Sequence, residues 1–163
     1  MVMGMTVQDV SVRNAGPADA AAIAAMIREL AAYEGMAQDV GFSTPQLQRA
    51  LTGDPPRLHV LVAEDADGPL GFVSYTIDFA IWTGTDVLRV DDVFVSSRAR
   101  RRGVGRLLMA RIAALATAAG MSARWELETK NHAAQQFYKG LGVSLRDKMV
   151  ARWDLAAMRA LLA

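Results

Sequence analysis

One stretch of the sequence joins a strand pattern to a helix pattern through arginines and glycines: Val93-Phe94-Val95-Ser96-Ser97-Arg98-Ala99-Arg100-Arg101-Arg102-Gly103-Val104-Gly105-Arg106-Leu107-Leu108. Glycines let a backbone come close to a ligand, and the first turn of a helix has unpaired N–H groups that favour negative charge. Arginines beside such a turn add charge-assisted contacts to phosphate. The stretch therefore predicts an anion-binding turn, and a solvated basic turn before a helix is the competing interpretation.

Helical and extended patterns alternate on both sides of this stretch. We expect strands over residues 11–13, 58–63, 70–79, 87–95 and 124–128, and two further extended pieces over 143–145 and 149–153. Helices are expected over residues 19–35, 44–51, 106–119, 133–139 and 154–162, with Asp19, Thr44 and Asp154 as caps. An antiparallel hairpin followed by a helical crossover is typical of one mixed α/β domain, here spanning residues 1–163.

The composition excludes several classes of protein. The chain has 163 residues, a formal net charge of +1 and no cysteine. It therefore has no disulfide framework, no thiolate metal site and no cysteine nucleophile. A near-neutral charge argues against a nucleic-acid coat. His59 and His132 stand apart without a metal-binding spacing, so no metal is expected.

Nothing in the sequence indicates a membrane protein. No run reaches the roughly 18 apolar residues of a membrane span. The opening Met1-Val2-Met3-Gly4-Met5 lacks the basic region of a signal peptide, and its three methionines leave the true start open. We expect a soluble, cytoplasmic protein.

Two motifs in order resemble the GNAT N-acetyltransferases. Arg100-Arg101-Arg102-Gly103-Val104-Gly105 resembles the family's R/Q-x-x-G-x-G/A motif, which holds the pyrophosphate of acetyl-CoA. Downstream, Asn131-His132-Ala133-Ala134-Gln135-Gln136-Phe137-Tyr138-Lys139-Gly140-Leu141-Gly142-Val143 resembles N-x-x-A-x-x-F-Y-x-x-x-G-F, with Val143 in place of the aromatic. The resemblance implies the GNAT fold, a single mixed and mostly antiparallel sheet with helices on both faces.

Within that family the chain looks most like the spermidine/spermine and thialysine acetyltransferase branch. The residues that carry this resemblance are Glu29-Leu30-Ala31-Ala32-Tyr33-Glu34-Gly35-Met36, Trp82 and Asp91-Asp92-Val93-Phe94-Val95. The chain departs from the branch near its C-terminus, where Arg146 and Lys148 stand in place of an acid and a tryptophan. This departure argues against a polycationic substrate.

The resemblance assigns the catalytic roles to two residues. An alkylammonium has a pKa near 10.4 and must lose a proton before its nitrogen can attack a thioester. Asp91 matches the branch's general base, and the alternative for Asp91-Asp92 is a structural pair of acids at a strand edge. Tyr138 matches the donor to the departing CoA thiolate, and the alternative is an ordinary half-buried tyrosine beside Phe137.

The other site residues also follow from the resemblance. Acetyl-CoA, as cosubstrate, is expected to contact Val93, Phe94, Val95, Arg100, Arg101, Arg102, Gly103, Val104, Gly105, Arg106, Asn131 and Ala134. For Val93 to Val95 the contact is through the backbone, which the family splays with a bulge at Phe94 and Val95. Asn131 is also suited to cap a helix. Tyr33, Glu34, Trp82 and Asp92 are expected to bind the substrate amine, although Tyr33 also suits ordinary packing.

The function that the sequence predicts is direct acetyl transfer from acetyl-CoA to the primary amine of a small molecule: a diamine, a polyamine or an amino-acid-like compound. The enzyme is expected to form a homodimer, and neither nucleic acid nor membrane is expected as a partner. Two alternatives stay open. One is acetylation of a protein N-terminus or lysine, and the other is a non-catalytic acyl-CoA-binding domain.

Overall fold

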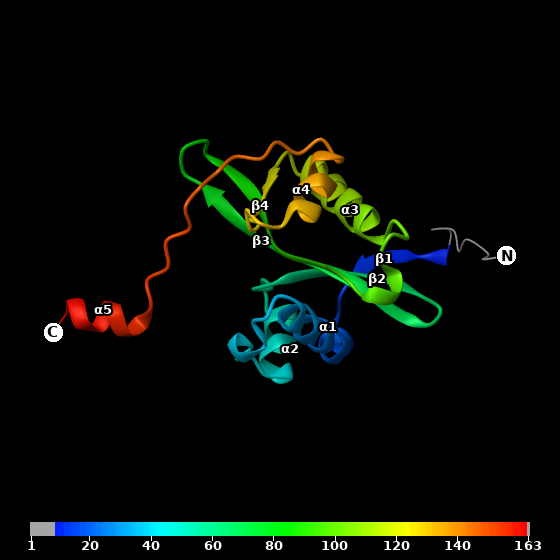
Figure 1. The fold of residues 1–163 in the computed structure, drawn as a ribbon, viewed down its shortest axis with the longest axis horizontal. Helices are drawn as coiled ribbons and strands as arrows, with labels where there is room; N and C mark the ends of the chain where they lie inside the picture. Colours follow the sequence, from blue (N-terminus) through cyan, green and yellow to red (C-terminus); the bar gives the residue numbers. More distant parts are fainter. Residues whose placement is uncertain (1–8, 163) are drawn as a thin grey trace. The chain divides into compact units, whose positions relative to one another are not determined.

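A computed structural model describes residues 9–162, and the chain divides into two compact units between Glu126 and Leu127. The first unit holds β1 (Ser11–Asn14), α1 (Ala20–Tyr33), α2 (Thr44–Thr52), β2 (His59–Asp65), β3 (Gly68–Ala80), β4 (Thr85–Val95), α3 (Val104–Ala118) and β5 (Ser122–Arg124). The second holds α4 (His132–Lys139) and α5 (Leu155–Leu161) (Figure 1). The opening segment Met1–Met5 lies outside the described residues. That the whole chain forms one domain stays a prediction.

The first unit is built on one five-stranded sheet in the order β1-β2-β3-β4-β5. The first four strands pair antiparallel with their neighbours in sequence, whereas β5 pairs parallel with β4. A parallel pair needs a crossover, and α3 supplies it between β4 and β5. The prediction of a mixed, mostly antiparallel sheet is therefore confirmed.

Helices cover both faces of this sheet, because successive strand residues point to opposite sides. On β2, Leu61 and Ala63 pack in the cluster that includes α3, while Val60 and Val62 pack in the cluster that includes α1 and α2. Figure 1 shows α3 on one side of the strands and α1 and α2 on the other. The expectation of helices on both faces is confirmed.

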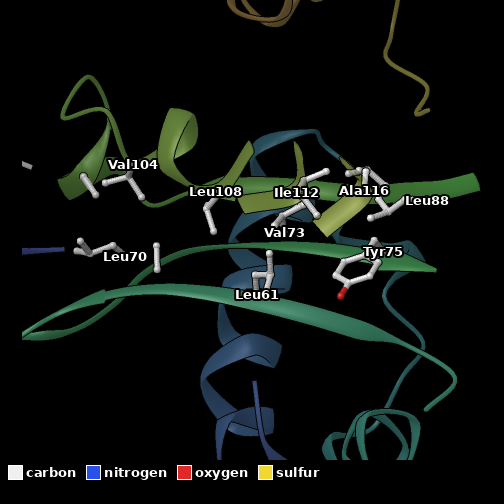
Figure 2. Close-up of a cluster of buried hydrophobic side chains, with 12 residues drawn as sticks. Leu61, Leu70, Val73, Tyr75, Leu88, Val104, Leu108, Ile112 and Ala116 are labelled. Atoms are coloured by element: carbon white, nitrogen blue, oxygen red, sulfur yellow. The ribbon is translucent and has the colours of Figure 1, made fainter. Parts of the chain in front are cut away.

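The α3 face has a close-packed apolar core. Val104, Leu108 and Ile112 follow one another along α3 and lie opposite Leu70 and Val73 of β3 (Figure 2). All five side chains are at most 1% exposed. Truncating such a residue to alanine costs about 2–5 kcal/mol through lost transfer energy and a residual cavity. This core holds the start of α3 firmly beside the sheet.

Two helix starts differ from the expected caps. Ser43, not Thr44, caps α2: its Oγ accepts the N–H of Gln46, whose side chain accepts the N–H of Ser43 in return. Asp19 precedes α1 but makes no capping bond. Its carboxylate instead accepts the Gly16 N–H at 2.7 Å and two bonds from Arg13 at 2.8 and 2.9 Å. A tertiary ion pair has replaced the local cap.

The segment after α3 contains less strand than its pattern indicates. β5 ends at Arg124, so the strand expected over 124–128 is wrong beyond that residue. The extended pieces expected over 143–145 and 149–153 form no strands in the described chain. A β-rich pattern shows only that a segment can be extended, since a strand also needs a partner edge for its backbone hydrogen bonds. Asp154 does cap α5, accepting the N–H of Ala157 at 2.9 Å.

No helix within residues 9–162 is long and apolar enough to cross a membrane.

Candidate active site

The predicted anion-binding turn lies between β4 and α3. Gly103 precedes α3 with a left-handed backbone (φ 80°), and Arg101 also has a positive φ of 60°. No side chain caps this helix. The N–H groups of Val104, Gly105 and Arg106 in its first turn therefore have no side-chain acceptor. Left-handed residues just before an open helix start form a concave set of amides that binds anions. The geometry agrees with the predicted phosphate cradle.

Two arginines of this segment are committed to the fold. Arg98 donates through Nη2 to the carbonyls of Pro69 at 2.9 Å and Gly68 at 3.3 Å. The Nη2 atom of Arg102 lies 3.6 Å from Oδ2 of Asp65, a side chain that is only 6% exposed. Asp65 thus has its charge compensated by the turn. These two guanidinium groups attach the turn to the β2–β3 hairpin.

Arg101 and Arg106 differ from these two arginines. Both residues are exposed. Within residues 9–162 neither has an acidic group within salt-bridge distance. Their charges are therefore available to a bound anion at the start of α3.

Arg100 connects the turn to α1. Its guanidinium lies over the ring of Tyr33, 4.7 Å from the centroid, and its Nε donates to the Val95 carbonyl at 3.3 Å. Tyr33 itself is 69% exposed. The structure therefore brings a predicted substrate residue into contact with a predicted cofactor residue.

A β-bulge lies in β4 at the predicted catalytic acid. Asp92 stands opposite Ser74 of β3, but the next register pair is Val90 with Tyr75. Asp91 is therefore the extra residue of the bulge. The bulge expected at Phe94 and Val95 lies at Asp91 instead.

The bulge places two consecutive carboxylates on one face of the sheet. Leu88 packs toward α3, so Arg89 points to the opposite face, and its Nη2 lies 3.0 Å from Oδ1 of Asp91, which therefore lies on that face too. Phe94 packs toward α1 and α2, so Asp92, two residues away, points to that same face. In a regular strand the two acids would point apart. Here both face the side covered by α1 and α2.

A row of alternating charges leads to these acids across three strands. Arg124 of β5 lies 3.1 Å from Asp78 of β3 through its Nη2 atom. The Nε atom of Arg89 lies 3.6 Å from the same Asp78 oxygen, and its Nη2 lies 3.0 Å from Oδ1 of Asp91. Within the described residues Asp92 has no basic group within salt-bridge distance. The row ends at Asp91, and Asp92 stands beside it.

Both acids have raised pKa values. Desolvation by the surrounding protein raises the pKa of Asp91, the Arg89 charge lowers it, and the Asp78 charge raises it. For Asp92, desolvation and then the charge of Asp91 raise the pKa, and a hydrogen bond with Ser74 lowers it. The side of β4 that the resemblance assigns to chemistry therefore holds two carboxylates that bind protons more readily than ordinary aspartates.

Backbone groups of β4 alternate in direction. The Ser96 N–H donates to the Leu70 carbonyl at 2.9 Å, which places Ser96 in a hydrogen-bonded pair with β3. Hydrogen-bonded positions recur at every second residue of an antiparallel strand. The Phe94 amide therefore points toward β3, and the amides of Val93 and Val95 point toward the other edge.

That other edge of β4 is only partly paired. β5 pairs with Val87–Arg89 and no further. Beyond Arg89 this edge of β4 has no strand partner among the described residues. The open edge offers the amides of Val93 and Val95, whereas the Phe94 amide belongs to the sheet.

The predicted substrate residues do not gather at one point. Trp82 is 98% exposed in the loop between β3 and β4, three residues before the first residue of β4. Tyr33 is tied through Arg100 to Val95, the last residue of β4. The eleven residues from Thr85 to Val95 span roughly 33 Å in an extended strand. Glu34 follows Tyr33 at the end of α1.

The remaining predicted residues belong to the second unit. Asn131 caps α4, its Oδ1 accepting the N–H of Ala134 at 3.0 Å. The capping interpretation of Asn131 is thus confirmed. Tyr138 is 8% exposed, its ring lies edge-on to Phe137, and burial raises the pKa of its phenol. The phenol therefore keeps its proton at neutral pH, as a proton donor must.

Two further expectations concern charged side chains. Arg146 and Lys148 are exposed in a segment without helix or strand. His59 stacks on Tyr75 with ring centroids 4.9 Å apart, which accounts for it as a strand residue. In the described part of the chain, no group of three His, Cys, Asp or Glu side chains is arranged to hold a metal.

Sequence reasoning missed Arg89, Asp78 and Ser74. Each is a polar residue of a strand, and the alternation of polar and apolar residues in a strand gives no sign of a functional role. A signal was present for Arg89, because Arg89 and Asp91 stand two apart on one strand and so share a face. For Asp78 and Ser74 only the β3–β4 register supplies the link.

Residues 24–143 match the family described as the acetyltransferase (GNAT) family. A thialysine N-epsilon-acetyltransferase from Bos taurus is 31% identical over 142 residues, covering 82% of this chain and 83% of that protein.

Solved structures are similar along most of the chain. An integron cassette protein from the mobile metagenome of V. cholerae has a TM-score of 0.76 and 28% identity, covering 94% of this chain and 98% of that one. An aminoglycoside N-acetyltransferase in complex with CoA has a TM-score of 0.72 at 18% identity, covering 90% and 95%. The second likeness is one of fold.

Proposed function

Because the chain belongs to the GNAT acetyltransferase family and is an N-acetyltransferase, we propose that it transfers the acetyl group of acetyl-CoA directly to the primary amine of a small molecule. The class of acceptor is a diamine, a polyamine or an amino-acid-like amine. The observation that carries the proposal is the arrangement around β4. The strand itself contains two carboxylates that share one face, and an anion cradle follows the strand.

The fit to acetyl-CoA rests on the chemistry of the groups present. The amides of Val104, Gly105 and Arg106, with the charges of Arg101 and Arg106, suit a pyrophosphate. The open-edge amides of Val93 and Val95 suit the amide-rich pantetheine arm and the thioester carbonyl. Acetyl-CoA, when bound, supplies an acyl group activated as a thioester.

Side chains of the protein remove the proton from the acceptor ammonium and supply a proton to the departing sulfur. A carboxylate of the bulge removes the proton from the acceptor ammonium, and the resemblance assigns this to Asp91. Tyr138 donates a hydrogen bond or a proton to the departing sulfur, for which its protonated phenol is suited. The side-chain NH₂ of Asn131 remains a donor toward the pantetheine chain while its oxygen caps α4.

Charge supports an amine as acceptor. Asp91 and Asp92 share one face of the sheet, and a primary ammonium is attracted to such a pair. Glu34 and Tyr33, at the end of α1, offer an acid and an aromatic ring to the same kind of cation. Arg146 and Lys148 stand where the resembling branch has an acid and a tryptophan, and this exchange favours short or amino-acid-like amines over polyamines.

We also propose that the enzyme acts as a homodimer. Large apolar side chains near the C-terminus are open to solvent: Met149 is 99%, Trp153 60% and Leu162 86% exposed. A second copy would bury this surface. Analytical ultracentrifugation tests it, and a monomer at micromolar concentration contradicts it.

The first experiment is thermal unfolding with and without acetyl-CoA. A ligand at 100 times its Kd stabilises the native state by about 2.7 kcal/mol. For a chain of this size that raises Tm by roughly 5–10 °C. An unchanged Tm at saturating acetyl-CoA contradicts the assignment.

The second experiment screens diamines, amino acids and peptides by the release of CoA thiol, for which a chain without cysteine adds no background. Turnover with small amines but not peptides supports the proposal. Turnover confined to peptides favours a protein acetyltransferase, and binding without turnover favours an acyl-CoA-binding domain.

A further inference from the structure

The two acids of the β4 bulge have different surroundings. Asp91 ends the alternating row of charges, with Arg89 Nη2 at 3.0 Å from its Oδ1. Arg89 is held in turn by Asp78 at 3.6 Å, and its Nε donates to the Thr76 hydroxyl at 3.5 Å. The Asp91 carboxylate is thus paired with the guanidinium of Arg89, which is itself fixed by Asp78 and Thr76.

Asp92 stands outside this row. Its backbone N–H donates to the Ser74 hydroxyl at 3.1 Å, and Ser74 is buried. Among residues 9–162 no arginine, lysine or histidine lies within salt-bridge distance of its carboxylate. The bulge nevertheless turns this carboxylate to the same face as Asp91.

We propose that Arg89 divides the work of the two acids: it holds Asp91 as a fixed carboxylate and leaves Asp92 as the group that takes the proton from the acceptor amine. Arg89 is then a positioning residue, and Asp92 replaces Asp91 as the general base. The inference rests on the proposed acetyltransferase function and deepens its chemistry.

The physical reason is electrostatic. An ion-paired carboxylate is a weaker base, because its partner's positive charge favours the deprotonated form. An unpaired carboxylate next to another negative charge is a stronger base for the converse reason. The groups that act on Asp91 are Arg89 of its own strand and Asp78 of β3, and those that act on Asp92 are Asp91 and Ser74.

The proton balance is simple. Asp92 takes one proton from the ammonium, which leaves the nitrogen lone pair free to form the bond to the acetyl carbon. As the carbon–sulfur bond breaks, the electron pair goes to sulfur. The nitrogen gives its second proton to solvent water, while Tyr138 gives its phenol proton to the thiolate and regains one from solvent. The proton on Asp92 then returns to solvent, so one proton is released for each acetamide formed.

The first test follows the two carboxyls directly, without turnover. Protein labelled with ¹³C at the aspartate carboxyl carbon is titrated by NMR, and Asp91→Asn and Asp92→Asn assign the two signals. The Asp92 signal is expected to titrate at higher pH than the Asp91 signal. In Arg89→Gln the Asp91 midpoint is expected to move up, because the lost guanidinium favoured the carboxylate. Arg111→Gln removes an exposed arginine from α3 on the opposite face and is expected to leave both midpoints in place.

The second test uses turnover with an acceptor found in the amine screen. Asp92→Asn is expected to lower kcat/KM at pH 7 by about 100-fold or more, the usual contribution of a general base. Asp91→Asn is expected to lose less than about 10-fold. It also moves the acid limb of the pH profile to lower pH, since the lost Asp91 charge had raised the proton affinity of Asp92.

The outcomes are distinct. A larger loss for Asp91→Asn than for Asp92→Asn, or an Asp91 signal that titrates above the Asp92 signal, overturns the inference. An Asp91 midpoint unmoved by Arg89→Gln removes Arg89 from it. If no amine is acetylated at all, the proposed function fails, and the NMR order of the two carboxyls still decides this inference.

Discussion

The Arg100 guanidinium covers the ring of Tyr33 at 4.7 Å from its centroid, and this contact joins the end of α1 to the turn before α3. The two residues were expected to serve different ligands, Tyr33 the amine and Arg100 the phosphates. Their contact makes the two sides of the site dependent on each other. A guanidinium over an exposed aromatic ring contributes about 0.5–1 kcal/mol.

A double-mutant cycle on Tyr33→Leu and Arg100→Gln should therefore show a coupling of about 0.5–1 kcal/mol in the free energy of unfolding. Urea denaturation measures each term. The pair Arg28 and Phe42, with the guanidinium 5.4 Å from the ring centroid, is a matched positive control elsewhere in the unit. Strict additivity for Tyr33 and Arg100 would show that the contact contributes nothing in solution.

Substitution of two glycines at opposite ends of α3 distinguishes the effect of backbone strain from the effect of lost ligand binding. Gly103 (φ 80°) precedes the helix and Gly120 (φ 66°) follows it, so alanine is strained at either position. Each substitution should cost about 1 kcal/mol of stability and lower Tm by roughly 2–4 °C. Only Gly103→Ala should also weaken acetyl-CoA binding, because its methyl group would stand in the phosphate cradle. Isothermal titration calorimetry compares the two variants.

The result for Gly120→Ala is the control for general destabilisation. At Gly120 an added methyl group would have no atom within 4 Å. Equal losses of acetyl-CoA affinity in both variants would argue against a cradle at the start of α3.

Tyr138→Phe tests the proposed donor to the departing sulfur. The change keeps the ring against Phe137 and removes only the hydroxyl. Turnover should fall by about 10²–10⁴-fold with little change in acetyl-CoA affinity, the signature of an interaction made during reaction. Stopped-flow release of CoA thiol and calorimetry give the two quantities. Unchanged turnover would remove Tyr138 from the mechanism.

Arg13 should make stability depend on pH. It bonds Asp19 at 2.8 and 2.9 Å and Glu64 at 2.8 Å through two atoms, and these bonds lower the pKa of both carboxyls. A lowered folded pKa stabilises the fold above the ordinary carboxyl pKa, and this stabilisation is lost as the pH falls through the folded value. Arg13→Met should cost about 1 kcal/mol at pH 7, a modest figure because Arg13 is partly exposed.

The stability difference between wild type and Arg13→Met should be constant above about pH 5 and shrink below about pH 4. Urea denaturation over this range measures it. A difference that persists unchanged at pH 3 would show that packing of the arginine stem, and not the ion pairs, is responsible.

The strand and helix patterns of the first unit could be predicted because each has its own period. Leu108 and Ile112 repeat at helical spacing and Val73 and Tyr75 at strand spacing, and burial on one face imposes these repeats. The same reasoning failed over 143–145 and 149–153. Those residues carry a β-rich pattern, but the pattern contains no information about a partner edge.

The sequence by itself determined the chemistry that this protein has at its disposal: a glycine turn with arginines before a helix, a pair of adjacent aspartates on a strand, and a tyrosine on a helix. It could do so because each of these signals is local, confined to a few consecutive residues. The sequence did not show which arginines belong to the fold, since Arg102 and Arg98 face a buried Asp65 more than thirty residues earlier.

Only the tertiary structure decided how these groups act together. The register of β3 against β4 places Asp91 in a bulge, turns it to the same face as Asp92 and brings Arg89 and Asp78 beside it. One residue more or less between two strands exchanges the faces of every side chain beyond it, and that count depends on pairing with a distant strand. The adjacent aspartates were visible in the sequence, but their unequal charge environments arise from strand pairing.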